Sequence, residues 1–421
     1  MVGSNNYGSA VLLSFCRTAT LFKFMSNQVY IISALRSPLC RGKSDGALST
    51  VHPVDLASSV ITKIVDETKI QKEDVEDLIV GCATACSEQG GNIGRNIARK
   101  ALNNSVPGMQ LSRWCGSGLE AIDIAACKVS SGNYDLILAG GVESMSRVQM
   151  GADMLPFAGN LSNIFKILSM GTKVITVTFP EGIELVPMGT SGELIAQKYG
   201  LSRKELDEFS YFSHMKAAKA KDNGHFEKEI TPIQTEKGLV TSDEGIRANT
   251  TPEKMAQLKP AFKIDGVVTA GNSSQITDGA AFVLLANETA CKRYGLQPRA
   301  KIVASHVIGS DPKLQLTGPI NLIPKVLKKA NLSLNDIDLF EINEAFASVV
   351  LATQTELNIP MQKINVNGGA IALGHPLGAS GARLIVTILH ELERRNLNKG
   401  LVALCIGGGQ AIGMIIERTK C

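Results

Sequence analysis

A cysteine followed by closely spaced glycines, Cys115-Gly-Ser-Gly118, is the first group in the sequence that could do chemistry. The stretch from Gln110 is typical of a short strand, a tight turn and a helix that begins at the cysteine. A thiol at a helix N-terminus faces unpaired backbone N–H groups and the positive end of the helix dipole, which favour the thiolate. The glycines let a substrate carbonyl approach these donors. Cys115 is therefore a candidate nucleophile, with a small buried packing residue as the alternative.

Three later segments carry groups that complement this thiol. His375 lies in a glycine-rich turn, Asn343 begins Asn-Glu-Ala-Phe-Ala, and Cys405 precedes three glycines. Each alone fits an ordinary structural role, because a single histidine is more often structural and glycine triplets are common turns. Together they supply a nucleophile, an imidazole base, a second thiol and polar donors. We expect all four at the carboxyl ends of strands, where open α/β sheets place their sites.

Alternating strands and helices are predicted around these residues, which indicates an α/β fold with a parallel sheet covered on both faces. Cys115 follows Asp77 by 38 positions and His375 follows Leu339 by 36, so the two halves resemble duplicates whose equivalent turns carry the reactive groups. The predicted strands cover 29–34, 74–80, 134–141, 336–342 and 401–409, a lead-in at 364–366 precedes the histidine turn, and helices cover 53–67, 92–101, 118–130 and 202–222.

Changes of composition along the chain predict its domains. The first residues lack Asp and Glu, and a core strand opens soon after Met25. The middle of the chain is more polar and supplies the lysines and arginines that a phosphorylated ligand requires. Within it, the apolar segment 161–179 predicts a core strand, with a subunit contact or an acyl-chain wall as alternatives. The divisions are an extension at 1–24, an N-terminal half at 25–145 completed by 273–298, an inserted loop domain at 146–272 and a C-terminal half at 299–421.

The bulk composition excludes several classes of protein. The chain has 421 residues, 44% of them apolar, and a net charge of +4 spread along its length. This spread argues against nucleic acid as the main partner, and no apolar run approaches the ~20 residues of a membrane helix. Nine cysteines without paired spacing predict a reducing compartment and no metal site. We expect a cytoplasmic protein, with an organelle transit peptide in residues 1–24 as the alternative.

The sequence resembles the thiolase family of acetyl-CoA acetyltransferases and 3-ketoacyl-CoA thiolases from about Met25 to Lys420. The resemblance implies a five-layered α-β-α-β-α fold of two duplicated halves with an inserted loop domain. It also implies acyl-CoA substrates, coenzyme A as substrate or product without a permanently bound cofactor, a homodimer or homotetramer, and room for a partner in a fatty-acid oxidation complex. The motifs that carry it are Cys115-Gly-Ser-Gly-Leu, Gly140-Gly-Val-Glu-Ser-Met-Ser, Thr269-Ala-Gly-Asn-Ser-Ser, Asn343-Glu-Ala-Phe-Ala, Gly374-His-Pro-Leu-Gly-Ala-Ser-Gly and Cys405-Ile-Gly-Gly-Gly.

The roles of the reactive residues follow from this resemblance. Cys115 would attack the acyl thioester and carry the acyl group, while His375 accepts its proton. Cys405, a thiol expected near neutral pKa, would move the α-proton of the second substrate. His375, with a water bound by Asn343, would face one thioester oxygen, and the backbone N–H groups of Cys115 and Gly407 would face the other. A covalent acyl-enzyme predicts ping-pong kinetics.

The resemblance also assigns contacts to coenzyme A. Arg247 matches a position near the adenine and phosphates, although a solvated arginine is the alternative, because exposed arginines are common. Ser274 matches a position that contacts the pantetheine. Phe262 and Phe346 would line the same tunnel, and Met188 would border the acyl pocket.

The acyl pocket is where the sequence departs from short-chain members of the family. They have His-Met-Gly where this chain has Pro187-Met188-Gly189, and Met-Gly where it has Gln315-Leu316. The Leu-Thr-Gly-Pro sequence that follows Gln315 resembles degradative thiolases, which favours longer 3-ketoacyl chains. Ala411, where glycine is usual, puts nothing essential in doubt.

Two other functions remain as alternatives to a thiolase. A ketoacyl-carrier-protein synthase would share the fold and the nucleophilic cysteine, but would be expected to lack Cys405-Ile-Gly-Gly-Gly. A catalytically silent acyl-CoA-binding protein is opposed by the four intact reactive positions.

Overall fold

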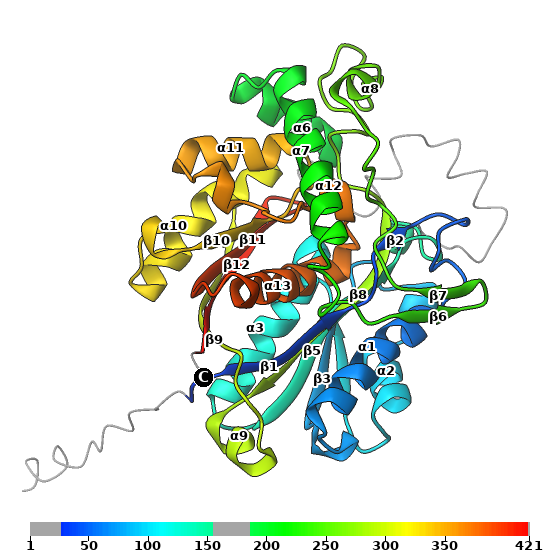
Figure 1. The fold of residues 1–421 in the computed structure, drawn as a ribbon, viewed down its shortest axis with the longest axis vertical. Coiled ribbons are helices and arrows are strands. Elements are labelled where there is room, and N and C mark those ends of the chain that lie inside the picture. The colour runs from blue at the N-terminus through cyan, green and yellow to red at the C-terminus, as the bar shows by residue number, and fades with distance from the viewer. Residues whose placement is uncertain (1–26, 155–185, 420–421) are drawn as a thin grey trace, which may run out of the picture.

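A computed structural model describes residues 27–154 and 186–419 (Figure 1). The extension at 1–24 and the apolar segment at 161–179 lie outside the described residues. No helix in the described ranges is long and apolar enough to cross a membrane.

The predicted helices and strands are present, with ends shifted by a few residues. The strands are β1 (Tyr30–Arg36), β2 (Cys40–Arg41), β3 (Asp77–Gly81), β4 (Gly108–Leu111), β5 (Leu136–Ser144), β6 (Ile233–Thr235), β7 (Gly238–Val240), β8 (Thr277–Ala286), β9 (Ala300–Gly309), β10 (Leu339–Ile342), β11 (Lys399–Ile406) and β12 (Gln410–Arg418). The helices are α1 (Pro53–Thr68), α2 (Ile93–Ala101), α3 (Ser117–Ser130), α6 (Met188–Lys198), α7 (Arg203–Asp222), α8 (Pro252–Ala256), α9 (Glu288–Tyr294), α10 (Gly318–Ala330), α11 (Ala347–Leu357), α12 (Ala370–Leu373) and α13 (Leu377–Arg394).

One continuous sheet joins the two halves in the order β10-β11-β12-β9-β1-β8-β5-β3-β4. The pairs β3–β4, β3–β5 and β10–β11 are parallel, whereas β5–β8, β8–β1, β11–β12 and β12–β9 are antiparallel. The prediction of a parallel sheet is therefore wrong for β1, β8, β9 and β12, which pair antiparallel. The reason is visible between β11 and β12, because a short glycine turn can only join antiparallel neighbours.

The two halves repeat the same strand pattern. In the first, β3, β5, β8 and β1 follow one another across the sheet, and in the second β10, β11, β12 and β9 do so with the same directions. The counterpart of β4 is a single parallel bridge between Ile364 and Phe340, so the lead-in to the histidine turn is shorter than expected. The duplication predicted from spacing is confirmed.

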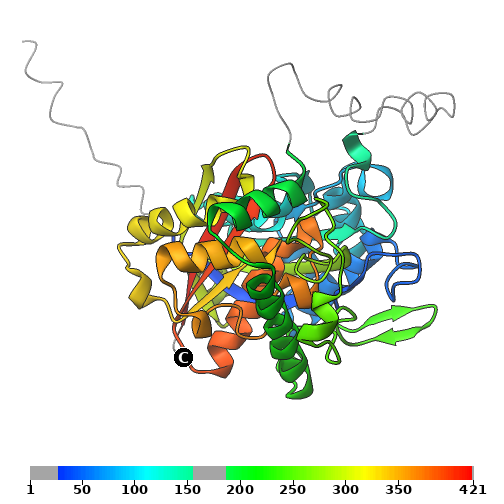
Figure 2. The same cartoon turned by 90° about the horizontal axis from the view of Figure 1, so that it is seen from above.

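The core forms five layers (Figures 1 and 2). Helices α1 and α2 pack on the outer face of the first half, and α10 and α11 on the outer face of the second. Helices α3 and α13 lie between the two halves in a shared apolar cluster. These two helices cross closely, because a Cβ on Gly118 would lie 2.7 Å from Gly378 O and a Cβ on Gly381 2.4 Å from Leu119 N. This close crossing brings the turns that precede α3 and α13 together.

Candidate active site

Cys115 lies in the turn that joins β4 to α3. A 3₁₀ turn spans Trp114–Gly116 and α3 begins at Ser117, so the thiol is two residues before the helix rather than at its start. The turn is sharp, with Trp114 at a φ of +46°. Ser117 stabilises it, because its hydroxyl accepts from Arg113 N at 2.9 Å and donates to Trp114 O at 2.6 Å.

The end of β11 approaches this turn directly. The backbone N–H of Gly407 lies near enough to the Cys115 thiol to favour its ionised form, and Cys405 lies close enough for the charge of an ionised Cys115 to act on it. A Cβ on Gly116 would lie 2.5 Å from the Ile406 side chain, so only glycine allows this approach. Both thiols are buried, with 6% of Cys115 and 1% of Cys405 exposed. The structure therefore brings the two predicted sulfur groups together.

His375 is oriented by hydrogen bonds on both ring nitrogens. Its Nδ1 lies 2.5 Å from Ser380 Oγ, which donates its own proton to Pro376 O at 2.8 Å. Ser380 must therefore accept from Nδ1–H, which leaves Nε2 as the nitrogen that carries the lone pair. Nε2 lies 3.3 Å from Asn343 Nδ2. The histidine follows the short helix α12 rather than a strand, so the prediction of four strand ends is wrong for His375.

Asn343 is wholly buried and joins the histidine to β11. Its backbone N–H donates to Ala403 O at 3.0 Å, two residues before Cys405. Its Oδ1 has no hydrogen-bond partner among the described residues. Because an unpaired buried amide oxygen costs about 1–3 kcal/mol of stability, this atom is suited to accept a hydrogen bond from water or from a substrate.

Burial keeps the reactive groups neutral. It raises the pKa of Cys115 to about 11, although the backbone N–H groups of Gly407 and Cys115 oppose this. It also raises the pKa of Cys405, with a further increase from the neighbouring Cys115. Burial and the charge of Arg383 lower the pKa of His375 to about 3. The expectations of a resting Cys115 thiolate and a near-neutral Cys405 are therefore wrong, because loss of hydration outweighs the donors.

Glu143 and Ser380 are the orienting residues that sequence reasoning did not single out. The buried Glu143 carboxylate accepts from Gly378 N at 2.8 Å, at the start of α13, and from Ala83 N at 2.8 Å on the other side. It therefore fixes the beginning of α13 against the first half. Both residues stand in motifs that were recognised, but a motif does not say which of its members contact the reactive group.

The segments assigned to pantetheine and the acyl pocket adjoin this centre. Ser274 N donates to Ala345 O at 3.0 Å, so it lies beside the Asn343 segment. Phe262 and Phe346 form an edge-to-face pair with centroids 5.9 Å apart. Met188 packs on the loop of Gly407, Gly408 and Gly409 between β11 and β12, the catalytic loop, because a Cβ on Gly407 would lie 2.2 Å from its Cε.

Comparison with known proteins identifies the family. The sequence matches the thiolase N-terminal domain over residues 29–289 and the thiolase C-terminal domain over residues 296–418. The chain belongs to the thiolase family.

Relatives and solved structures match this thiolase along nearly its whole length. It is 42% identical to the 3-ketoacyl-CoA thiolase of Bacillus subtilis and 40% identical to a probable acetyl-CoA acyltransferase of Staphylococcus aureus. Each match covers 93% of this chain, and 99% and 100% of those proteins. A Bacillus anthracis acetyl-CoA acetyltransferase and the human mitochondrial 3-ketoacyl-CoA thiolase in complex with CoA both align with a TM-score of 0.83. They are 37% and 35% identical, and the alignments cover 94% of this chain and 100% and 99% of theirs.

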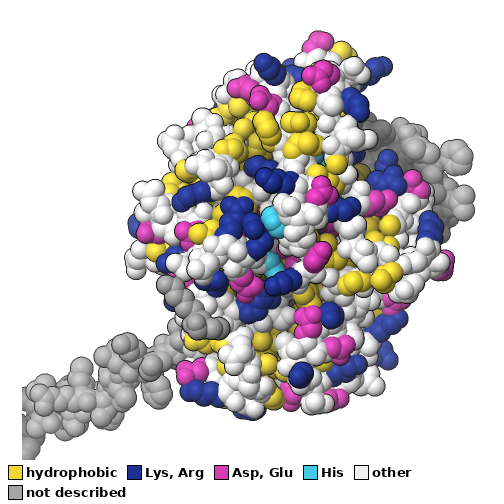
Figure 3. Space-filling view, viewed as in Figure 1, with side chains coloured by type: hydrophobic (Ala, Val, Ile, Leu, Met, Phe, Trp, Pro, Cys, Tyr) yellow, Lys and Arg dark blue, Asp and Glu magenta, His cyan; other side chains and the backbone are white. Residues whose placement is uncertain are grey.

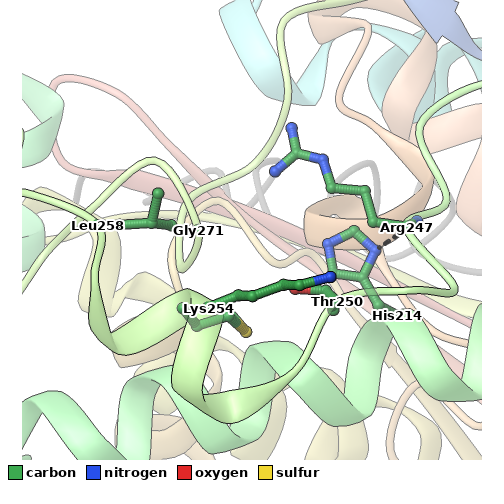
Figure 4. Close-up of a pocket in the computed structure, with 7 residues that line it drawn as sticks. His214, Arg247, Thr250, Lys254, Leu258 and Gly271 are labelled. Carbon is green, nitrogen blue, oxygen red and sulfur yellow. Dashed lines mark hydrogen bonds between the residues drawn. The ribbon is translucent and has the colours of Figure 1, made fainter.

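Arg247 of this thiolase lies in a separate small pocket (Figure 4). The pocket has a volume of about 120 Å³ and is lined by Arg247, His214, Thr250 and Lys254 among others. Arg247 N donates to His214 Nδ1 at 3.2 Å, and burial together with Arg247 lowers the pKa of His214 to about 4. His214 is therefore neutral, and the positive charge at the pocket comes from Arg247 and Lys254.

A larger groove of about 350 Å³ lies between α7 and α11. Apolar side chains gather over these helices in the space-filling view (Figure 3), and Phe212 is half exposed there. Glu344, the neighbour of Asn343, lines the groove and is fully hydrogen-bonded by Ser213, Asn365 and Ile371 N. None of the predicted site residues lines this groove.

Proposed function

We propose that this thiolase cleaves 3-ketoacyl-CoA with coenzyme A through an acyl-enzyme on Cys115. The observation that carries the proposal is the meeting of the Cys115 thiol with Gly407 N–H and Cys405, on a turn that adjoins the turn of His375. Packing alone does not require two neighbouring thiols and an imidazole on the adjoining turn, all of them buried.

In the first half-reaction, the Cys115 sulfur bonds to the 3-keto carbon and its proton passes to His375 Nε2. The C2–C3 bond then breaks, and the enolate of acetyl-CoA takes a proton from Cys405. In the second, the thiol of coenzyme A gives its proton to Cys405 and attacks the acyl thioester. Cys115 leaves and recovers its proton from His375, so the enzyme returns to its starting state. The same steps in reverse condense two acyl-CoA molecules.

The order in which Cys115 and Cys405 react follows from the short distance between them. An ionised Cys115 opposes ionisation of Cys405, whereas an acylated Cys115 carries no charge. Acylation therefore keeps this opposing charge absent while Cys405 gives up its proton, a step that would otherwise leave two thiolates side by side.

Charge on the thioester oxygens is stabilised by two sets of donors in this proposal. His375 and a water bound by the unpaired Asn343 Oδ1 serve one oxygen, and the backbone N–H groups of Cys115 and Gly407 serve the other. Removing one such donor from other enzymes costs about 3 kcal/mol in the transition state.

We assign coenzyme A to a path from Arg247 to Cys115. Arg247 and Lys254 would supply positive charge for its phosphates, Ser274 would contact pantetheine, and Phe262 with Phe346 would form an apolar wall. A preference for longer 3-ketoacyl chains is supported by Pro187 and Gln315 at the acyl pocket, and the Bacillus subtilis relative is named a 3-ketoacyl-CoA thiolase.

We also propose the domain division at 25–145 with 273–298, 146–272 and 299–421. It is supported by β8, which returns to the first half and pairs with both β1 and β5. A homodimer or homotetramer and a reducing cytoplasmic location belong to the same proposal. The described cysteines are all free, which supports the location.

Two measurements on the purified protein test the function. Mass spectrometry after mixing with acetyl-CoA should show an acetyl group on the Cys115 peptide. Thiolysis measured with short, medium and long 3-ketoacyl-CoA should give turnover that rises beyond the shortest substrate. Binding of acyl-CoA without acylation and without turnover would instead identify a catalytically silent binder.

A further inference from the structure

Gln315 is a buried amide, 1% exposed, in the 3₁₀ turn Gln315–Thr317 before α10. Its Oε1 accepts from the backbone N–H of Gly408 at 2.6 Å. Its Nε2 donates to Val186 O at 2.6 Å and to Ser191 Oγ at 2.9 Å. These partners fix the orientation of the amide. A rotated amide would place its NH₂ group against the N–H of Gly408 and its oxygen against the carbonyl oxygen of Val186.

One end of Gln315 contacts the catalytic loop. Gly408 directly follows Gly407, whose N–H favours the ionised form of the Cys115 thiol. Gly408 and Gly409 have φ of +73° and +78°, and glycine backbone is the least restricted of all. A loop of this kind requires external bonds to fix its peptide planes, and Gln315 binds the N–H next to the catalytic one.

The other end of Gln315 contacts the segment around Met188, which we assign to the wall of the acyl pocket. Val186 and Ser191 flank Met188, whose Cε packs on Gly407. Ser191 Oγ in turn donates to Lys313 O at 2.8 Å, which fixes it to the segment of Gln315 itself. The Gln315 side chain therefore sets the position of the pocket wall relative to the catalytic loop.

We propose that Gln315 is a positioning residue that couples the fit of the acyl chain to stabilisation of the thioester oxygen. This inference rests on the proposed function and deepens it. A methionine or leucine at this position could fill the volume, but could not bind Gly408 N and Val186 O at the same time. Only a side chain with both a donor and an acceptor can make all three hydrogen bonds and so join the catalytic loop to the wall of the acyl pocket.

The main test is Gln315→Met, which keeps the volume and removes all three hydrogen bonds. We expect kcat for the best 3-ketoacyl-CoA to fall by about 10-fold to 100-fold, below the full loss of an oxyanion donor, because Gly407 N–H is displaced but still present. KM should change less than kcat, and the ratio of kcat/KM between medium and short substrates should fall toward one. Wild-type kcat and wild-type chain-length preference in the folded variant would overturn the proposal.

A second variant, Gln315→Glu, keeps the test decisive if the methionine variant does not fold. A protonated carboxyl can still accept from Gly408 N and donate to Val186 O, whereas an ionised one can only accept. Its kcat relative to wild type should therefore fall as the pH rises from about 6 to about 8, since burial raises a carboxyl pKa into this range. A ratio that does not change with pH would contradict the positioning role.

Asn287→Ala is the matched control. Asn287 is also a buried amide with several hydrogen bonds, but it caps α9 away from the catalytic loop. This variant should lose thermal stability and keep the wild-type chain-length profile. Absence of thiolysis and acylation in the wild-type enzyme would refute the proposed function itself, whereas an active wild type with an unaffected Gln315→Met refutes only this inference.

Discussion

The turns that precede α3 and α13 occupy equivalent places in the two halves, yet they present opposite chemistry. One carries a thiol and the other an imidazole, and burial shifts their pKa values in opposite directions, Cys115 to about 11 and His375 to about 3. The cause is the same, because loss of hydration disfavours an anionic thiolate and a cationic imidazolium alike. Cys115 and His375 are therefore both neutral in the resting enzyme.

This comparison explains why both turns are needed. A preformed thiolate could attack without a base, but a buried neutral thiol requires an acceptor for its proton as the new bond forms. In the proposed mechanism His375 is this acceptor, because it is unprotonated at physiological pH and its Nε2, 3.3 Å from Asn343 Nδ2, carries the lone pair. Breaking either turn should therefore remove most of the activity.

The largest effect is expected for Cys115→Ser. A serine hydroxyl is a poorer nucleophile at this site, and loss of a covalent nucleophile costs about 10⁴-fold or more in kcat. Steady-state thiolysis and mass spectrometry of the acyl-enzyme measure the effect. Cys127→Ser, on the same helix but outside the site, is the control and should keep full activity. Normal turnover by Cys115→Ser would show that the first turn does not carry the nucleophile.

His375→Gln tests the second turn. Glutamine fills much of the volume but cannot accept the thiol proton, so kcat should fall by about 10²-fold to 10⁴-fold, the usual contribution of a general base. The rate of acylation by acetyl-CoA, measured in a single turnover, should fall with it. His306→Gln, on β9, changes a histidine outside the site. Equal losses in both variants would mean that the effect is structural.

Alkylation with iodoacetamide distinguishes a neutral thiol from a thiolate. With a pKa of about 11, the alkylation rate of Cys115 should rise about tenfold for each pH unit between about pH 7 and 10, because the thiolate fraction rises in that proportion below the pKa. Peptide mass spectrometry at each pH gives the rate. A plateau near neutral pH would mean that the helix N-terminus outweighs burial, and the comparison of the two turns would then lose its basis.

The sequence predicted the duplication, because it depends on order and spacing along the chain, and the four reactive positions stay a prediction that rests on the motifs. The antiparallel strands of the sheet were not predicted, since pairing between β8 and β1 depends on segments far apart in sequence. The direction of the Cys115 pKa shift was also missed. Helix-end donors can be expected from local sequence, but the burial that opposes them comes from β11 and Ile406, which approach only in the folded chain.

Ser380→Ala gives the smallest effect and sharpens the comparison. The alanine removes the acceptor for Nδ1–H, so His375 can adopt the other tautomer and place a proton on Nε2, where the thiol proton must go. We expect kcat to fall about tenfold, which corresponds to about 1.4 kcal/mol, with KM nearly unchanged. Acylation should slow by the same factor, since the imidazole acts in that step. Loss of thermal stability without loss of acylation rate would mean that Ser380 only packs against the histidine. Another residue would then have to keep the proton of His375 on Nδ1.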